Sequence, residues 1–157
     1  MKKFNIMAVL LLFSISVLAI VPPDNVQATF KKMYPKTNDI AWSQDDGYYC
    51  ANFVMNGFTK NVWFNAQGQW ETQTDLVSLD RLTPVVYNAF TFSSYASWVA
   101  EDVTMVEFPK WQAIIVIEVG QDNVDIKYQL FYTPKGILLK TRNVSYMYDI
   151  LGPGTFL

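Results

Sequence analysis

The sequence contains no histidine and a single cysteine, Cys50. These absences exclude histidine-dependent triads, histidine-ligated metals, multi-cysteine zinc sites and any disulfide within the chain. After the first three residues no basic run is longer than Lys31-Lys32, so the basic stripe that binds a phosphate backbone is missing. Neither a glycine-rich phosphate loop nor a nucleophile elbow is present. We therefore expect no cofactor, no metal, no nucleic-acid partner and no catalysis.

The amino terminus has the pattern of an export signal. Two lysines precede an apolar run over residues 6–20, which is short for a membrane span and contains small residues near its end. We expect a signal peptide over residues 1–19, with cleavage after Ala19 and no membrane span in the mature chain; an uncleaved anchor helix is the alternative. The expected location is the bacterial periplasm or the outside of the cell. There, a lone cysteine such as Cys50 is most simply a buried apolar residue.

The remaining sequence shows one pattern twice. In a chain that is 51% apolar and 16% aromatic, proline is followed by apolar residues four apart, first after Pro22-Pro23 and again after Pro84. This spacing predicts two short amphipathic helices. After each helix come four alternating segments with strand character, separated by turn residues. The predicted strands cover residues 39–44, 48–56, 58–65 and 69–75 in the first half, and 102–108, 111–119, 124–132 and 137–142 in the second.

The last turn of each half makes the internal repeat most visible. Residues 63–70 align with residues 131–138, and Gly68 and Gly136 occupy the same place in a tight hairpin. Because every connection between strands is of hairpin length, we expect two antiparallel meanders joined edge to edge. The predicted fold class is α+β: a tandem duplication of an α-β4 unit that forms an antiparallel eight-stranded sheet with helices on one face.

The predicted boundaries follow from this repeat. The domain covers residues 20–143, with repeats at about 22–75 and 82–143, and a C-terminal tail covers residues 144–157. Two separate small domains are the alternative arrangement, although the connection over residues 76–82 is rich in leucine and valine and is therefore unlike a linker.

Several features of the first half follow one another in a recognisable order. They are a helix that begins near Val26 and ends at Tyr34-Pro35, a strand that carries Trp42, and a turn with Phe64, Gly68 and Trp70. With the signal peptide, this order resembles the PepSY-like domains of exported Bacteroidetes proteins, whose fold is similar to that of β-lactamase inhibitory protein. The resemblance covers residues 22–143 and implies a tandem α/β repeat with a curved sheet. The inhibitor that the family resembles grips an enzyme loop with an aromatic-rich face of its sheet, and this chain departs from that inhibitor in having no disulfide-forming pairs.

Strand alternation assigns one face of the sheet to the helices, through residues such as Phe53, Phe64 and Ile117. The opposite face is polar with embedded aromatic residues, which more often mark a contact surface than chance. The expected ligand-binding residues on that face are Tyr48, Asn52, Trp63, Val116, Gln129 and Phe131. Two alternatives remain open, because the apolar tail could cover this face and a register error of one residue would swap the two faces.

The function predicted from these observations is that of an exported, non-enzymatic binding or inhibitory module. Its expected partner is a protein, a peptide or another envelope component, and its oligomeric state is left open. A domain that binds carbohydrate or another small ligand is the alternative, because flat aromatic rings also stack on sugars. Asp45-Asp46 and Glu101-Asp102 are adjacent carboxylates, which we interpret as solvated residues of turns and strand starts and not as an acid–base pair.

Overall fold

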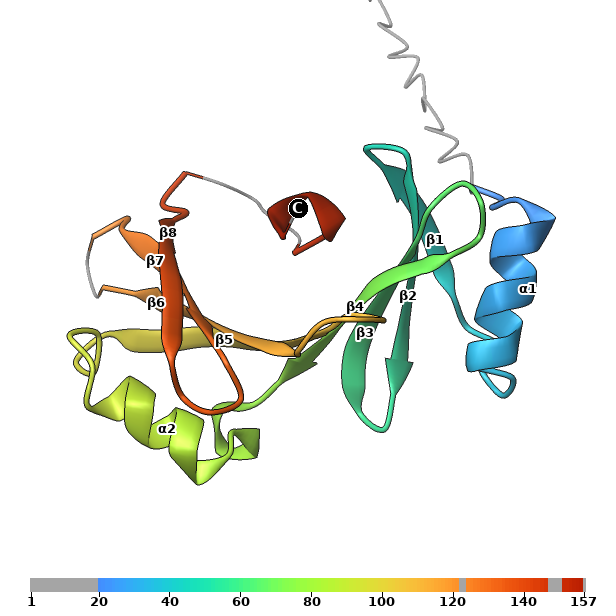
Figure 1. Ribbon diagram of the computed structural model, residues 1–157. Coiled ribbons are helices and arrows are strands. Elements are labelled where there is room, and N and C mark those ends of the chain that lie inside the picture. Colours follow the sequence, from blue (N-terminus) through green and yellow to red (C-terminus); the bar gives the residue numbers. More distant parts are fainter. Residues whose placement is uncertain (1–19, 122–123, 147–150, 157) are drawn as a thin grey trace, which may run out of the picture.

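Figure 1 shows the computed structural model of the chain, which describes residues 20–121, 124–146 and 151–156. The expected signal peptide over residues 1–19 lies outside the described residues, and so does the part of the tail over residues 147–150. No helix within the described ranges is long and apolar enough to cross a membrane.

The described residues contain eight strands that form one sheet in chain order, and every neighbouring pair is antiparallel. The strands are β1 (Ala41–Asp45), β2 (Tyr48–Met55), β3 (Phe58–Phe64), β4 (Trp70–Val77), β5 (Val99–Glu107), β6 (Ile114–Gly120), β7 (Lys127–Tyr132) and β8 (Leu138–Asn143). The pairing of β4 with β5 joins the two halves, from Gln73 opposite Glu107 to Val77 opposite Val103. The α+β class with a single eight-stranded antiparallel sheet is therefore confirmed, and the alternative of two separate domains is wrong.

The two helices lie on the convex side of the curved sheet, as Figure 1 shows. α1 (Asp24–Met33) follows Pro23, and α2 (Pro84–Thr91) begins after Thr83, whose hydroxyl accepts a hydrogen bond from the backbone N–H of Val86 at 3.4 Å. Each helix buries two apolar residues that are four positions apart and therefore lie on one face. These residues are Val26 and Phe30 in α1, and Val86 and Phe90 in α2.

The convex side contains two apolar clusters, one beneath each helix. In the first, Phe53, Val62 and Phe64 of the sheet pack against α1, and the ring of Phe30 meets that of Phe53 edge to face at a centroid distance of 5.3 Å. In the second, the buried residues of α2 pack against Ile117 and its neighbours on β6 and β7. The faces of the strands are therefore assigned as the alternation predicted, and the alternative of a shifted register is wrong.

Three predicted strands of the second half begin three residues away from the predicted starts at 102, 111 and 124: β5 begins at Val99, β6 at Ile114 and β7 at Lys127. β6 begins at Ile114 and not at residue 111, because residues 108–113 form the connection after β5. Tyr95 lies in the turns that follow α2, where its ring packs against Trp98 at a centroid distance of 5.3 Å. The later start of β6 places Trp111 in the loop before this strand, where it is exposed.

Gly68 and Gly136 occupy equivalent hairpin turns, and both have a positive φ of 76°. Each turn also lies against the helix of its own half. A Cβ at Gly68 would come within 2.9 Å of the backbone carbonyl of Asn25 in α1, and one at Gly136 would come within 3.0 Å of the carbonyl oxygen of Val85 in α2. Glycine is therefore required at these turns both by the backbone conformation and by the close approach of a helix.

Gly68→Ala is expected to destabilise the protein more than Gly47→Ala. Both glycines have positive φ, but a Cβ at Gly47 would meet nothing within 4 Å, whereas one at Gly68 would collide with α1. Strain of the backbone alone costs about 1 kcal/mol, and displacement of the helix adds about 1–3 kcal/mol at Gly68. Urea unfolding of both variants measures the difference. Equal decreases in the free energy of unfolding would show that the contact between the turn and α1 does not constrain position 68.

Candidate functional site

The concave face of the sheet, opposite the helices, is partly covered by the end of the chain. The described part of the tail, residues 151–156, contains a short 3-10 helix, η2 (Pro153–Thr155), and lies within the curve of the sheet in Figure 1. Leu151 and Phe156 pack on a third apolar cluster of the concave face. The other residues of this cluster are Val106, Ile114, Val116 and Phe131 of the sheet, and Phe108 directly after β5.

Coverage by the tail corrects the expectation of an open face. Trp63, Val116, Gln129 and Phe131 lie on the predicted face, but each is at most 3% exposed. The physical reason is that Leu151 and Phe156 remove more apolar surface from water by packing onto this face than by remaining in solvent.

Trp63 shows how closely the tail fits onto the sheet. A Cβ at Gly152 would lie 3.3 Å from the Trp63 ring, so the backbone of the tail approaches this ring directly. The remaining two predicted residues keep contact with solvent at the edge of the face. Tyr48 is partly exposed, and Asn52 is exposed while its side chain donates a hydrogen bond to Asn61 Oδ1 at 2.7 Å.

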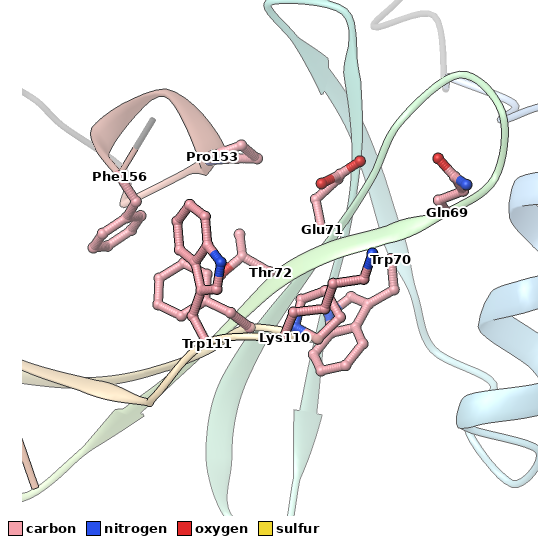
Figure 2. A pocket seen from close by; sticks show the side chains of 10 residues that line it. Gln69, Trp70, Glu71, Thr72, Lys110, Trp111, Pro153 and Phe156 are labelled. Atoms are coloured by element: carbon pink, nitrogen blue, oxygen red, sulfur yellow. The ribbon is translucent and has the colours of Figure 1, made fainter.

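An aromatic-lined hollow of the surface lies beside the tail, where β4 faces the loop between β5 and β6. We call it the aromatic cleft; it has a volume of about 280 Å³ and is shown in Figure 2. Its aromatic walls come from three separate segments: Trp70 of β4, Phe108 and Trp111 after β5, and Phe156 of the tail. The ring centroids of Phe108 and Phe156 are 5.2 Å apart, and those of Phe108 and Trp111 are 5.8 Å apart.

The aromatic cleft combines an exposed ring with polar groups at its rim. Trp111 is 62% exposed, which is unusual for so large an apolar side chain. Gln69 and Glu71 extend from the start of β4 on the other side of the cleft, and Lys110 lies near Trp70 (Figure 2). The indole Nε1 of Trp70 is buried and has no hydrogen-bond partner within the described ranges.

Sequence reasoning missed the aromatic cleft because it placed Trp111 in a strand. The available signal was Pro109-Lys110, a turn that directly precedes this tryptophan. A tryptophan in a loop has no position in the alternation of a strand, so its burial cannot be assigned from periodicity. The sequence also could not show that Phe156 forms a wall of the aromatic cleft, because the position of the tail depends on the folded sheet.

The adjacent carboxylates lie where the sequence predicted. Asp45 and Asp46 are at the turn between β1 and β2, where Asp46 has a φ of 45°, and Glu101 pairs with Lys127 at the start of β5. The described ranges contain no group of three or more metal-ligating side chains. These carboxylates thus show no arrangement that would hold a metal.

Cys50 is buried, as predicted, and burial raises the pKa of its thiol to about 12. Hydrogen bonds from Ser43 and from the backbone of Val62 lower this pKa, but by less than burial raises it. Burial likewise raises the pKa of Tyr34 to about 12, with the Asp75 and Glu107 carboxylates acting in the same direction. Both groups are therefore held in their neutral form in the folded protein.

Taken together, these features define an α+β domain with an open antiparallel sheet, helices on the convex side and an aromatic cleft beside the tail on the concave side. The chain belongs to the beta-lactamase-inhibitor-like, PepSY-like family, whose model matches residues 47–140. The resemblance to exported PepSY-like domains of Bacteroidetes is thereby confirmed. Among curated proteins, none matches the chain.

Solved structures from Bacteroides share the whole fold. A DUF2874 family protein from Bacteroides ovatus is 78% identical, with a TM-score of 0.86 over 88% of this chain and 99% of that chain. A protein from Bacteroides eggerthii described as periplasmic is 46% identical, with a TM-score of 0.84 over 87% and 99% of the two chains. A BLIP-like protein from Bacteroides fragilis is 33% identical, with a TM-score of 0.78 over 85% and 94%.

These relatives set the location and the general class of the protein. The chain is a periplasmic or secreted domain, in agreement with its similarity to the periplasmic protein of Bacteroides eggerthii. The family is inhibitor-like and not catalytic, which indicates a binding module.

The raised pKa values of Cys50 and Tyr34 predict that stability falls at alkaline pH. The stabilising contribution of a neutral buried group is fully present below its unfolded pKa, about 9 for the thiol and about 10 for the phenol, and is lost as the pH rises toward about 12. Urea unfolding between these pH values should show this decline, and Cys50→Ala should make it shallower. Tyr146→Phe is the control, because Tyr146 is 91% exposed. An identical decline of stability in the wild type and in Cys50→Ala would contradict the prediction that the buried thiol of Cys50 contributes to it.

Proposed function

We propose that this protein is a non-enzymatic module of the bacterial envelope that docks a protein or peptide through the aromatic cleft and the adjoining rim of the concave face. The observation that carries the proposal is the exposed ring of Trp111 in a cleft walled by three other aromatic side chains. Aromatic anchors surrounded by polar groups are typical of the energetic centres of protein interfaces. The inhibitor-like family and the similarity to a BLIP-like protein support the same function.

The proposed surface keeps part of the predicted one. Tyr48 and Asn52 remain accessible at the edge of the concave face and extend the proposed contact area. In this proposal Trp63 and Phe131 support the tail that forms one wall of the aromatic cleft, and they do not contact the partner themselves. Val116 and Gln129 line a separate hollow of the concave face beside Leu151.

A carbohydrate is the second candidate ligand. The flat exposed ring of Trp111 faces a cleft whose rim includes Gln69 and Glu71, and aromatic stacking combined with polar side chains is suited to a sugar ring. The two candidates differ in how binding energy is distributed. A sugar depends on one or two stacked rings, whereas a protein contact is spread over a larger area.

We also infer that the two halves arose by tandem duplication of one α-β4 unit. Each half consists of a helix followed by four antiparallel strands, and each helix buries two apolar residues four positions apart. The close approach of Gly68 to α1 and of Gly136 to α2, at the same φ of 76°, supports this origin.

Trp111→Ala is expected to abolish binding of the partner while leaving the fold intact. Because this side chain is mostly exposed and contacts Phe108 at the edge of the cleft, its loss should change the free energy of unfolding by less than about 1 kcal/mol. Recovery of the partner from Bacteroides envelope extract should fall at least about tenfold, as expected for an interface anchor. Quantitative pull-down with wild type and variant, followed by mass spectrometry, measures this loss.

Phe92→Ala is the matched control, since Phe92 is 89% exposed and follows α2 on the helix side. It should recover the same partner as the wild type. Equal recovery by all three proteins would reject the aromatic cleft as the binding surface. Binding of an oligosaccharide that Trp111→Ala abolishes, without any protein partner, would instead establish the carbohydrate candidate.

A further inference from the structure

A second hollow of the concave face has a different chemistry. It lies toward the other end of β4 and β5 from the aromatic cleft, next to Leu151, and has a volume of about 160 Å³. This space exceeds the roughly 30 Å³ that one water occupies in the liquid. We call it the acidic notch, because its lining includes Asp102 and Glu118 but no lysine or arginine.

The two carboxylates of the acidic notch belong to neighbouring strands and lie on the same face of the sheet. Asp102 of β5 and Glu118 of β6 are directly opposite partners, so their side chains lie side by side on the concave face. Like charges in this position repel one another unless a cation lies between them. Within the described ranges no ion pair engages Asp102, whose side chain is exposed, so its charge is available to a ligand.

The neighbouring cations, Lys127 and Arg142, do not line the acidic notch. Lys127 pairs with Glu101 and lies 4.0 Å from one oxygen of Glu118, so it neutralises this pair of glutamates only in part. Arg142 is opposite Gln129 on β8, but it lines the hollow on the far side of the tail, near the β1–β2 turn. Among the described residues, Lys127 thus contacts Glu101 and Glu118 but not Asp102.

An unpaired acceptor completes the acidic notch. Gln129 is only 2% exposed, and its Nε2 donates to Glu118 Oε2 at 3.2 Å, which fixes the orientation of the amide. Its Oε1 is buried and has no hydrogen-bond partner in the part of the chain that the structure describes. Buried polar atoms nearly always have a partner, so an acceptor left unpaired beside two carboxylates points to a missing donor.

We propose that the acidic notch binds a guanidinium group, supplied by an arginine side chain of a partner protein. A guanidinium carries five donors in one plane and can reach Asp102, Glu118 and Gln129 together, whereas an ammonium offers a single compact charge. Val116 and Leu151 line the same hollow and provide an apolar surface for the aliphatic part of the side chain. The binding of a guanidinium group is argued from the acidic notch itself. Only the statement that a partner protein supplies this group rests on the proposed function.

The acidic notch is tested with a small probe, Nα-acetyl-arginine amide, added to the purified protein. Nuclear magnetic resonance should show saturable shifts of the Gln129 side-chain amide and of the backbone at Asp102 and Glu118, in about the millimolar range expected for one side chain. Nα-acetyl-citrulline amide has nearly the same shape without the charge and should not bind. Nα-acetyl-lysine amide should bind more weakly than the arginine probe.

Substitutions of a carboxylate by the amide of the same shape test whether the probe binds at the acidic notch. Asp102→Asn should weaken binding of the arginine probe about tenfold, because a charge-assisted hydrogen bond becomes a neutral one. Glu118→Gln provides a second test if the first variant is unstable. The control is Asp46→Asn, which removes a carboxylate from the β1–β2 turn and should leave binding unchanged.

Three outcomes would overturn the proposal: no saturable shift with the arginine probe, equal binding of the citrulline probe, or unchanged affinity in both notch variants. The outcome is separate from that of the pull-down experiment. If the arginine probe binds but no partner protein is captured, the guanidinium site is supported and the proposed docking function is rejected. If a partner is captured through Trp111 but the probe does not bind, the docking function is supported and the guanidinium site is rejected.

Discussion

The pairing of β4 with β5 is the constraint on which the rest of the architecture depends. Each half of the chain alone would be a four-stranded meander with one helix, too small to bury much apolar surface. Because β4 and β5 pair from Gln73–Glu107 to Val77–Val103, the sheet continues through the middle of the molecule and the two helices fall on the same side. The concave side is left without a helix, which is why the tail docks there.

The junction between the halves is held by polar contacts on both faces of the sheet. On the concave side, the Thr72 hydroxyl donates to the backbone oxygen of Glu107 at 2.9 Å. On the convex side, Gln73 donates to the Glu107 carboxylate at 2.8 Å, and the Tyr34 hydroxyl donates to Gln73 at 2.6 Å. The ion pair of Lys60 with Asp75, at 2.6 Å, lies on the same side. The region between the two apolar clusters is thus filled by side chains that satisfy one another, which avoids the cost of burying unpaired polar groups.

The sequence contained enough information for the sheet, because each element followed from local chemistry. Alternation with a period of two identified Phe53 and Val62 as core, and Pro84 together with Gly68 marked a helix start and a hairpin turn. The surface could not be predicted in the same way. The position of Phe156 depends on the shape of a sheet that is already assembled, and Trp111 belongs to a loop, where its ring contacts that of Phe108.

Placement of the tail also limits how a partner can use the concave face. A partner that displaced residues 151–156 would return Leu151, Val116 and Phe131 to water unless it replaced each contact, and burial of one such side chain is worth roughly 1.5–3 kcal/mol. Binding beside the tail carries no such cost, since Phe156 already forms a wall of the aromatic cleft and Leu151 a wall of the acidic notch. In the proposed function the tail is therefore part of the recognition surface, and it lies between the aromatic cleft and the acidic notch.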